Sequence, residues 1–195
     1  MTPTSHDHEI ASISGFSDAQ IDALMRDASE CVLMWVSRDS WPAGATHAFV
    51  WHDGCVWVTF AAHRHRAAAI RRNNRVSALV SSVAGHSPER PHGAVTLRGR
   101  AYFHDDRKTK AWLYEALSKK LKPGDKTGEE AFYRLLDSPL RVVVEIVPEQ
   151  WITYDQHKAG RDMAGMLEES ESAPRKRADA IRMNQQRARR GLPPR

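Results

Sequence analysis

The stretch Thr46-His-Ala-Phe-Val-Trp-His-Asp-Gly-Cys-Val-Trp-Val-Thr-Phe60 carries the clearest local signal in the sequence. Two runs rich in β-branched and aromatic residues, 46–51 and 55–60, flank the turn His52-Asp-Gly54. An Asp-Gly pair favours the tight turns that join antiparallel strands, because its residues tolerate a positive φ. The stretch therefore predicts a β-hairpin.

On both sides of this hairpin, further strands alternate with short helices. The capping-box sequence Ser17-Asp-Ala-Gln20 predicts a helix over 17–28. Apolar periodicity and turn residues predict the other elements, which are a strand over 31–36, a turn over 38–44, a helix over 64–73, a strand over 76–83, a loop over 84–92, a strand over 93–104, a helix capped by Asp105 or Asp106 and ending near 121, a helix over 128–137, and strands over 140–147 and 151–154 separated by Pro148. This order favours an antiparallel barrel over a doubly wound parallel sheet.

Length and composition are those of one globular domain, with 195 residues and 41% hydrophobic side chains. No apolar run approaches the roughly 18 residues that cross a bilayer, and the start of the chain is polar, so we expect a cytoplasmic protein. The two cysteines are too few for a disulfide framework. We expect a disordered leader over 1–14, a barrel domain over 15–158 and a polar, Arg-rich tail over 159–195.

The formal net charge of +5 is concentrated at the C-terminus. Residues 173–195 hold eight Lys and Arg against the single acid Asp179, a charge of +7, which leaves the rest of the chain at −2. Such a tail can bind a polyanion through counterion release. Aromatic residues are not interleaved with its arginines, so a solvated helix, or one that embraces a partner, is favoured over nucleic-acid binding.

Residues 54–88 contain no Asp or Glu, where about four would be expected at the average frequency in this chain. Five arginines lie in this stretch: Arg64, Arg66, Arg71, Arg72 and Arg75. The last three come at or after the end of the predicted helix 64–73, where cations suit the negative end of the helix dipole. We interpret those three as a solvated surface.

Arg64 and Arg66 fall instead where this helix begins, at the positive end of the dipole. Two cations are unfavourable there unless they share an anion. The free N–H groups of the first helical turn, the two guanidinium groups and the hydroxyl of Thr59 would together bind a phosphate or a carboxylate. The alternative is that both arginines point into solvent.

Other chemistries find less support in the sequence. His63 and His65 form an i, i+2 pair without a nearby acidic third ligand, so no metal site is predicted. No Ser-His-Asp or Cys-His arrangement can be argued, and no catalytic residue is assigned. If the protein catalyses a reaction, a bound cofactor is the best candidate to perform it.

The segment Phe49–Val76 resembles the FMN-binding split β-barrel family of pyridoxamine 5'-phosphate oxidase-like proteins, which also includes flavin- and deazaflavin-dependent reductases. The shared pattern is a hairpin with an Asp-Gly turn, a strand ending in Thr, a loop with a basic pair, a short helix and then Asn-Pro-Arg-Val. Asn74 replaces the usual Pro here. A looser resemblance covers about 17–158, and it implies a mainly β, α+β fold: an antiparallel split β-barrel with short flanking helices.

The resemblance implies that Arg64 and Arg66 bind the cofactor phosphate, with Arg66 where the family commonly has Lys. It places Thr59 and Phe60 along the isoalloxazine or ribityl edge. The remaining cofactor contacts that it implies are Thr46, His47, Ser81 and Ser82. The substrate-binding Arg and His of true pyridoxamine phosphate oxidases have no clear match near the C-terminus, which argues against vitamin B6 chemistry.

The function implied by the resemblance is a cytoplasmic oxidoreductase that binds FMN and transfers hydride or electrons to a small organic substrate. One alternative uses the deazaflavin coenzyme F420 instead of FMN. Another is a flavin- or haem-binding protein without turnover, because one fold can carry several functions. Members of the family are typically homodimers that build each cofactor groove from both subunits, so we expect a homodimer here.

Overall fold

The computed structural model describes residues 15–82, 90–171 and 177–194. The chain divides into two compact units, Ser17–Thr153 and the described parts of Met1–Phe16 and Tyr154–Arg195. The leader predicted over 1–14 and most of the loop predicted over 84–92 lie outside the described residues.

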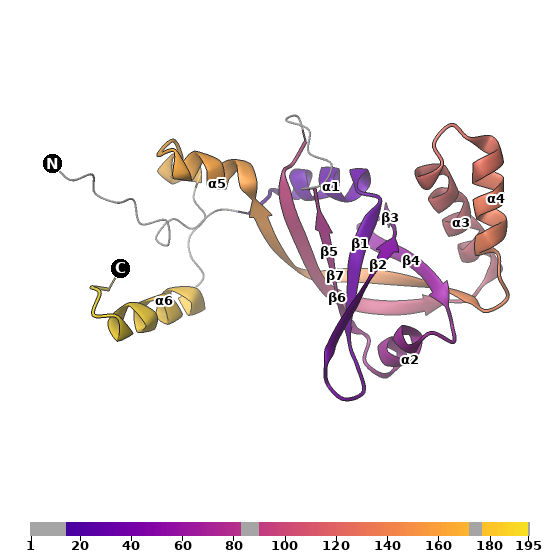
Figure 1. Ribbon diagram of the computed structural model, residues 1–195, viewed down its shortest axis with the longest axis horizontal. Coiled ribbons are helices and arrows are strands. Elements are labelled where there is room, and N and C mark those ends of the chain that lie inside the picture. The colour runs from indigo at the N-terminus through magenta and orange to yellow at the C-terminus, as the bar shows by residue number, and fades with distance from the viewer. Residues whose placement is uncertain (1–14, 83–89, 172–176, 195) are drawn as a thin grey trace. The chain divides into compact units, whose positions relative to one another are not determined.

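The first unit is built on a curled, seven-stranded antiparallel sheet (Figure 1). Its strands are β1 (Glu30–Val36), β2 (Pro42–Ala48), β3 (Val50–His52), β4 (Cys55–Ala61), β5 (Arg75–Ser81), β6 (Gly93–His104) and β7 (Arg141–Asp155). They lie in the order β2-β1-β5-β6-β7-β4-β3. The predicted antiparallel split barrel is confirmed.

The predicted hairpin is confirmed at its turn but not along its first strand. Asp53 and Gly54 have φ angles of 49° and 72°, as a tight turn requires, and β3 pairs with β4 across them. The run 46–51, however, is not one strand. β2 pairs with β1, and the chain changes partner at Phe49, whose side chain is fully buried and whose N–H donates to the Ser29 carbonyl oxygen at 3.2 Å.

The turn predicted over 38–44 is shorter than expected, because β2 already begins at Pro42. The break predicted at Pro148 is also wrong, since β7 is continuous from Arg141 to Asp155. The pairing of β7 with β4 ends at Ile146, so the missing N–H of Pro148 removes no bond to that strand. Near this point β6 approaches β7 closely at Gly99, where an added Cβ would lie 2.1 Å from the Val147 carbonyl oxygen.

The described residues of this unit form four helices: α1 (Asp18–Asp27), α2 (His65–Arg72), α3 (Arg107–Leu121) and α4 (Lys126–Leu136). Ser17 and Gln20 form the predicted capping box, and Asp106 caps α3. The α3–α4 pair packs on the sheet through one buried cluster. The cluster consists of Leu113, Tyr114, Leu117, Leu136 and Val143 of β7.

The second unit contains the helices α5 (Gln156–Met163) and α6 (Arg177–Arg189) and a short 3-10 turn at Glu169–Glu171. The Arg-rich segment that the sequence identified is therefore helical over α6. In the described parts of the chain, no helix combines the length and the apolar character that crossing a membrane would need.

Candidate functional site

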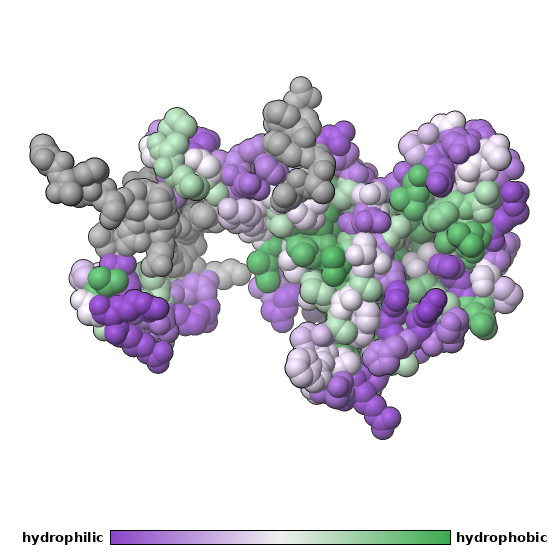
Figure 2. Space-filling model, viewed as in Figure 1, coloured by the Kyte–Doolittle hydropathy of each residue, from purple (hydrophilic) through white to green (hydrophobic). Residues whose placement is uncertain are grey.

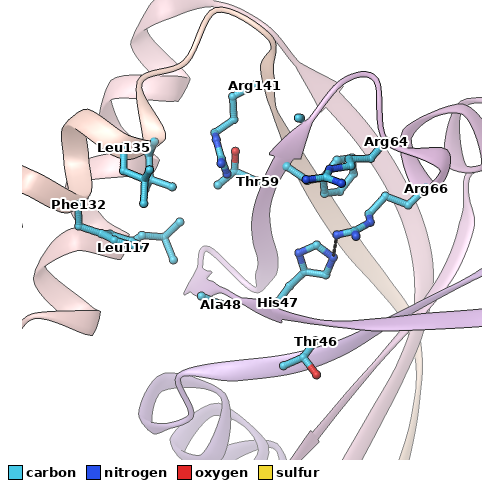
Figure 3. Close-up of a pocket in the computed structure, with 13 residues that line it drawn as sticks. Thr46, His47, Ala48, Thr59, Arg64, Arg66, Leu117, Phe132, Leu135 and Arg141 are labelled. Atoms are coloured by element: carbon cyan, nitrogen blue, oxygen red, sulfur yellow. Dashed lines mark hydrogen bonds between the residues drawn. The ribbon is translucent and has the colours of Figure 1, made fainter.

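A cleft of about 440 Å³ lies at the C-terminal end of β4, between β2, the start of α2 and the α3–α4 pair (Figure 3). Its volume falls in the range of roughly 300–1,000 Å³ that is typical of small-molecule sites. The residues that line it are Thr46, His47, Ala48, Thr59, Phe60, Ala61, Arg64, Arg66, Leu117, Phe132, Leu135, Leu136 and Arg141.

Positive charge dominates this cleft. Arg64 and Arg66 come from the start of α2, Arg141 comes from the start of β7, and none of the described lining residues is acidic. Burial, and then the neighbouring Arg64, lower the pKa of Arg66. Burial also lowers the pKa of Arg141, against an opposing effect of Tyr114. Since burial and like charge both disfavour these cations, an anion bound among them would be stabilised.

The start of α2 adds backbone donors to the cleft. Arg64 occupies the N-cap position, its side chain makes no capping hydrogen bond, and the first turn of α2 holds no acidic residue. The Ala67 N–H already donates to the Arg64 carbonyl oxygen at 2.9 Å, so the backbone donors that this end offers are the N–H groups of His65 and Arg66. The helix dipole makes this end positive. The local backbone is therefore suited to a phosphate or carboxylate oxygen.

His47 positions Arg66. The two side chains meet at 2.8 Å between His47 Nε2 and Arg66 Nη1 (Figure 3). Because a guanidinium only donates, Nε2 accepts and the imidazole proton lies on Nδ1. Burial first, and then Arg66 and Arg141, lower the pKa of His47 to about 4. The ring is thus neutral near pH 7 and does not add to the positive charge.

Aromatic rings complete the surroundings of Arg66. Its guanidinium carbon lies 5.7 Å from the centroid of the Phe60 ring and 5.8 Å from that of Trp35. Phe60 also lies beside His47, with ring centroids 5.6 Å apart. Contacts with ring faces at these distances favour a cation, so Arg66 is held in place before any ligand binds.

The Thr59 hydroxyl, which was predicted to bind the phosphate, already donates a hydrogen bond within the sheet. Its Oγ1 donates to the Val142 carbonyl oxygen at 2.8 Å, and the residue is buried. A hydroxyl has one proton, so Thr59 could donate to a phosphate only by giving up this bond. Its oxygen still accepts, which suits the other predicted role beside an N–H or O–H group of a cofactor.

The structure brings most of the predicted site residues to one cleft, namely Thr46, His47, Thr59, Phe60, Arg64 and Arg66. Ser81 and Ser82 are not among the lining residues. Ser81 is exposed at the end of β5, and the Ser82 hydroxyl accepts from the Gly93 N–H at 2.9 Å. Their role as cofactor contacts stays a prediction.

Sequence reasoning missed Arg141 and the apolar wall formed by Leu117, Phe132, Leu135 and Leu136 of α3 and α4. Arg141 pairs with Ala61 in the register between β7 and β4, which brings it beside the end of β4. The one signal in the sequence was a charged residue placed directly before the apolar run Val142-Val-Val144.

Two other predictions concern residues outside this cleft. The side chains of Arg71, Arg72 and Arg75 are exposed, although the Arg71 guanidinium covers the Phe103 ring at 4.2 Å. His63 and His65 are exposed as well. Within the described residues, no group of three His, Cys, Asp or Glu side chains is arranged to hold a metal ion.

Comparison with known proteins rests on structure, because no family model and no curated protein matches the sequence. A conserved hypothetical protein of Mycobacterium tuberculosis superposes with a TM-score of 0.64 at 20% identity, covering 77% of this chain and 91% of that one. A haem storage protein from Vibrio cholerae gives a TM-score of 0.56 at 13% identity over 70% of this chain and 94% of that one.

Two further neighbours carry the names of enzymes. An F420 reductase superposes with a TM-score of 0.53 at 21% identity, covering 70% of this chain and 98% of that one. A protein from Listeria innocua described as a pyridoxamine 5'-phosphate oxidase gives a TM-score of 0.52 at 24% identity over 69% of this chain and 95% of that one. The chain thus has the split β-barrel fold of the pyridoxamine 5'-phosphate oxidase-like proteins.

Proposed function

We propose that this protein is an oxidoreductase that binds a flavin-type cofactor, FMN or a deazaflavin, through its phosphate and acts on a small organic substrate. The observation that carries the proposal is the cluster of Arg64, Arg66 and the uncapped start of α2 in a cleft whose described lining is free of acidic residues. When bound, a cofactor of this type supplies the hydride or electron transfer.

Several residues of the cleft have a defined part in this proposal. The side chains of Arg64 and Arg66 and the N–H groups of His65 and Arg66 bind the phosphate, and His47 holds the Arg66 side chain through its hydrogen bond. Thr59 accepts a hydrogen bond from the cofactor body. The apolar side chains on α3 and α4 exclude water from the opposite wall.

A haem-binding function has less support from the geometry. Of the described residues that line the cleft, only His47 carries an imidazole. Its Nε2 is bonded to Arg66, and its Nδ1 carries the proton, so neither nitrogen is available to ligate iron. Split-barrel neighbours include a haem storage protein, and haem is therefore one arm of the test below.

The split-barrel resemblance also implies a homodimer, and we include this state in the proposal. Two apolar side chains near the β1–β2 turn are exposed, Trp41 to 69% and Val36 to 39%. Exposed apolar side chains of this kind are suited to a contact with a second subunit.

The test is titration of the purified full chain with FMN, F420 and haem, followed by absorbance and fluorescence. We expect FMN or F420 to bind, and Arg64→Gln and Arg66→Gln each to weaken binding by about 10- to 100-fold, the size of one or two lost charge-assisted hydrogen bonds. Arg98→Gln is the matched control, because Arg98 is exposed on β6 and bonds to Gln150. Undiminished binding in the Arg64 and Arg66 variants would contradict the proposal.

A further inference from the structure

The cleft holds more positive charge than a cofactor phosphate requires. A phosphate monoester carries a charge of about −1.5 to −2 at pH 7. Arg64, Arg66 and the positive end of α2 already balance that charge. Arg141 is a third cation, contributed by β7 rather than by α2, and none of the described lining residues is an acid that could neutralise it.

One hydrogen-bond donor of the Arg141 guanidinium lacks a partner in the part of the chain that the structure describes. Its Nε is buried and has no hydrogen-bond partner among the described residues. Figure 3 shows its side chain extending towards Thr59, on the side of the cleft away from the Arg66–His47 pair. A guanidinium matches two oxygens of a carboxylate or of a phosphate in a bidentate fork. Since the phosphate is assigned to Arg64 and Arg66, a carboxylate is the anion left for Arg141.

The wall next to Arg141 is apolar. Leu117 and Leu136 are buried, Phe132 is partly buried, and Leu135 remains 65% exposed at the edge of the cleft. In Figure 2 hydrophobic surface is visible over the region of α3 and α4. Burying such surface contributes about 25 cal/mol per Å², so an apolar chain held beside Arg141 would be stabilised by this wall.

We infer that Arg141 is a specificity-determining residue that binds the carboxylate of an organic acid, with the apolar chain of that acid against Phe132 and Leu135. The inference rests on the proposed function, because it assigns the phosphate of the cofactor to Arg64 and Arg66. It names the class of substrate as a carboxylic acid with an apolar body.

The test measures binding of sodium hexanoate to the FMN-loaded full chain by isothermal titration calorimetry. Hexan-1-ol and hexylamine serve as uncharged and cationic probes of the same length. Hexanoate is expected to bind in preference to both, and Arg141→Gln is expected to weaken its binding at least about tenfold while FMN affinity changes less than about threefold. Arg141→Lys should retain part of the affinity, and Arg98→Gln all of it.

Two results would overturn the inference. Hexanoate could bind equally well to wild type and Arg141→Gln, which would exclude a carboxylate contact. Arg141→Gln could instead weaken FMN binding as strongly as Arg64→Gln does, which would make Arg141 part of the phosphate site. Failure of the proposed function would give another result. FMN would then bind to neither the wild type nor the variants, while hexanoate binding to the cofactor-free chain would still depend on Arg141.

The apolar part of the inference has its own readout in the dependence on chain length. Hexanoate should bind at least about tenfold more tightly than acetate, because each buried CH₂ group contributes. Leu135→Ser should reduce this ratio, and the variant should fold, since Leu135 is 65% exposed. An unchanged ratio would show that the chain does not lie against α4.

Discussion

The two walls of the cleft are built in different ways. Arg64, Arg66 and His47 all come from the short stretch 46–66, which contains the hairpin turn and the start of α2. The opposite wall consists of Arg141 and of side chains from α3 and α4, and it is held to the sheet by a buried cluster. One wall is set by local sequence and the other by long-range packing.

Because the two walls are built differently, we expect them to have different functions. The α2 wall carries the helix dipole, a guanidinium held by a hydrogen bond and a neutral histidine. Its ability to bind an anion should therefore not change when residues elsewhere shift slightly. The α3–α4 wall depends on Leu117 and Leu136 packing near Val143, and any change in that packing moves the wall. Cofactor binding should therefore follow the first wall, and substrate preference the second.

The largest expected effect comes from breaking the packed wall. Leu117 is 2% exposed in the α3–α4 cluster, and Leu117→Ala should lower the free energy of unfolding by about 2–5 kcal/mol, because it removes buried methyl groups and leaves a cavity. Urea denaturation measures this loss. Folded Leu117→Ala should still bind FMN within about threefold of wild type, since the α2 wall is intact.

Leu135→Ala is the matched control for Leu117→Ala, because Leu135 lies on the paired helix and is 65% exposed. Its free energy of unfolding should change by no more than about 0.5 kcal/mol. If Leu117→Ala abolished FMN binding in the folded protein, the two walls would not be independent, and the contrast between them would fail.

A pH experiment sharpens the comparison from the other wall. The pKa of His47 is about 4 in the folded chain, lowered by burial and then by Arg66 and Arg141, against 6.5 for an ordinary histidine. Between these two pH values the unfolded chain binds more protons at His47 than the folded chain does. The stability that comes from the neutral His47 is therefore fully present above pH 6.5 and is lost as the pH falls towards 4. The loss amounts to about 3 kcal/mol.

Other groups also titrate in this range, so the measurement is the difference between wild type and His47→Gln in urea denaturation from pH 7.5 to 4.5. Glutamine can still accept from Arg66 but has no titrating proton. The free energy of unfolding should fall more steeply for wild type than for the variant. Parallel slopes would show that His47 is not kept neutral by its surroundings.

Local signals in the sequence were sufficient for much of the fold and for one wall of the site. The Asp53-Gly54 pair located the hairpin turn, and the position of Arg64 and Arg66 at a helix start indicated an anion site. These features depend on residues that are close along the chain, where turn geometry and helix dipoles act.

The errors lie where distant segments decide the outcome. Phe49 ends β2 because it is buried in the folded core, which no local pattern reveals. Arg141 reaches the cleft because β7 pairs with β4. The two strands are far apart along the chain: Thr59 of β4 and Val142 of β7, which are hydrogen-bonded, are separated by 83 positions. Without that pairing, neither Arg141 nor the role of Thr59 could be predicted.

The smallest expected change in the free energy of unfolding comes from removing the Thr59 hydroxyl, whose hydrogen bond connects the strands of the two walls directly. Its hydroxyl joins β4 to the Val142 carbonyl oxygen of β7, next to Arg141. Thr59→Val keeps the shape of the side chain and removes this bond, so the free energy of unfolding should fall by about 1 kcal/mol. Urea denaturation measures the change.

The control for this bond is Thr46→Val, an exposed position on β2 at the rim of the same cleft. It should change the free energy of unfolding by less than about 0.5 kcal/mol, because β-branched residues are well tolerated on strands and no buried bond is lost. Equal losses in the two variants would assign the effect to the exchange of Thr for Val itself. A loss confined to Thr59→Val would assign it to the bond that holds β7, and with it Arg141, against the end of β4.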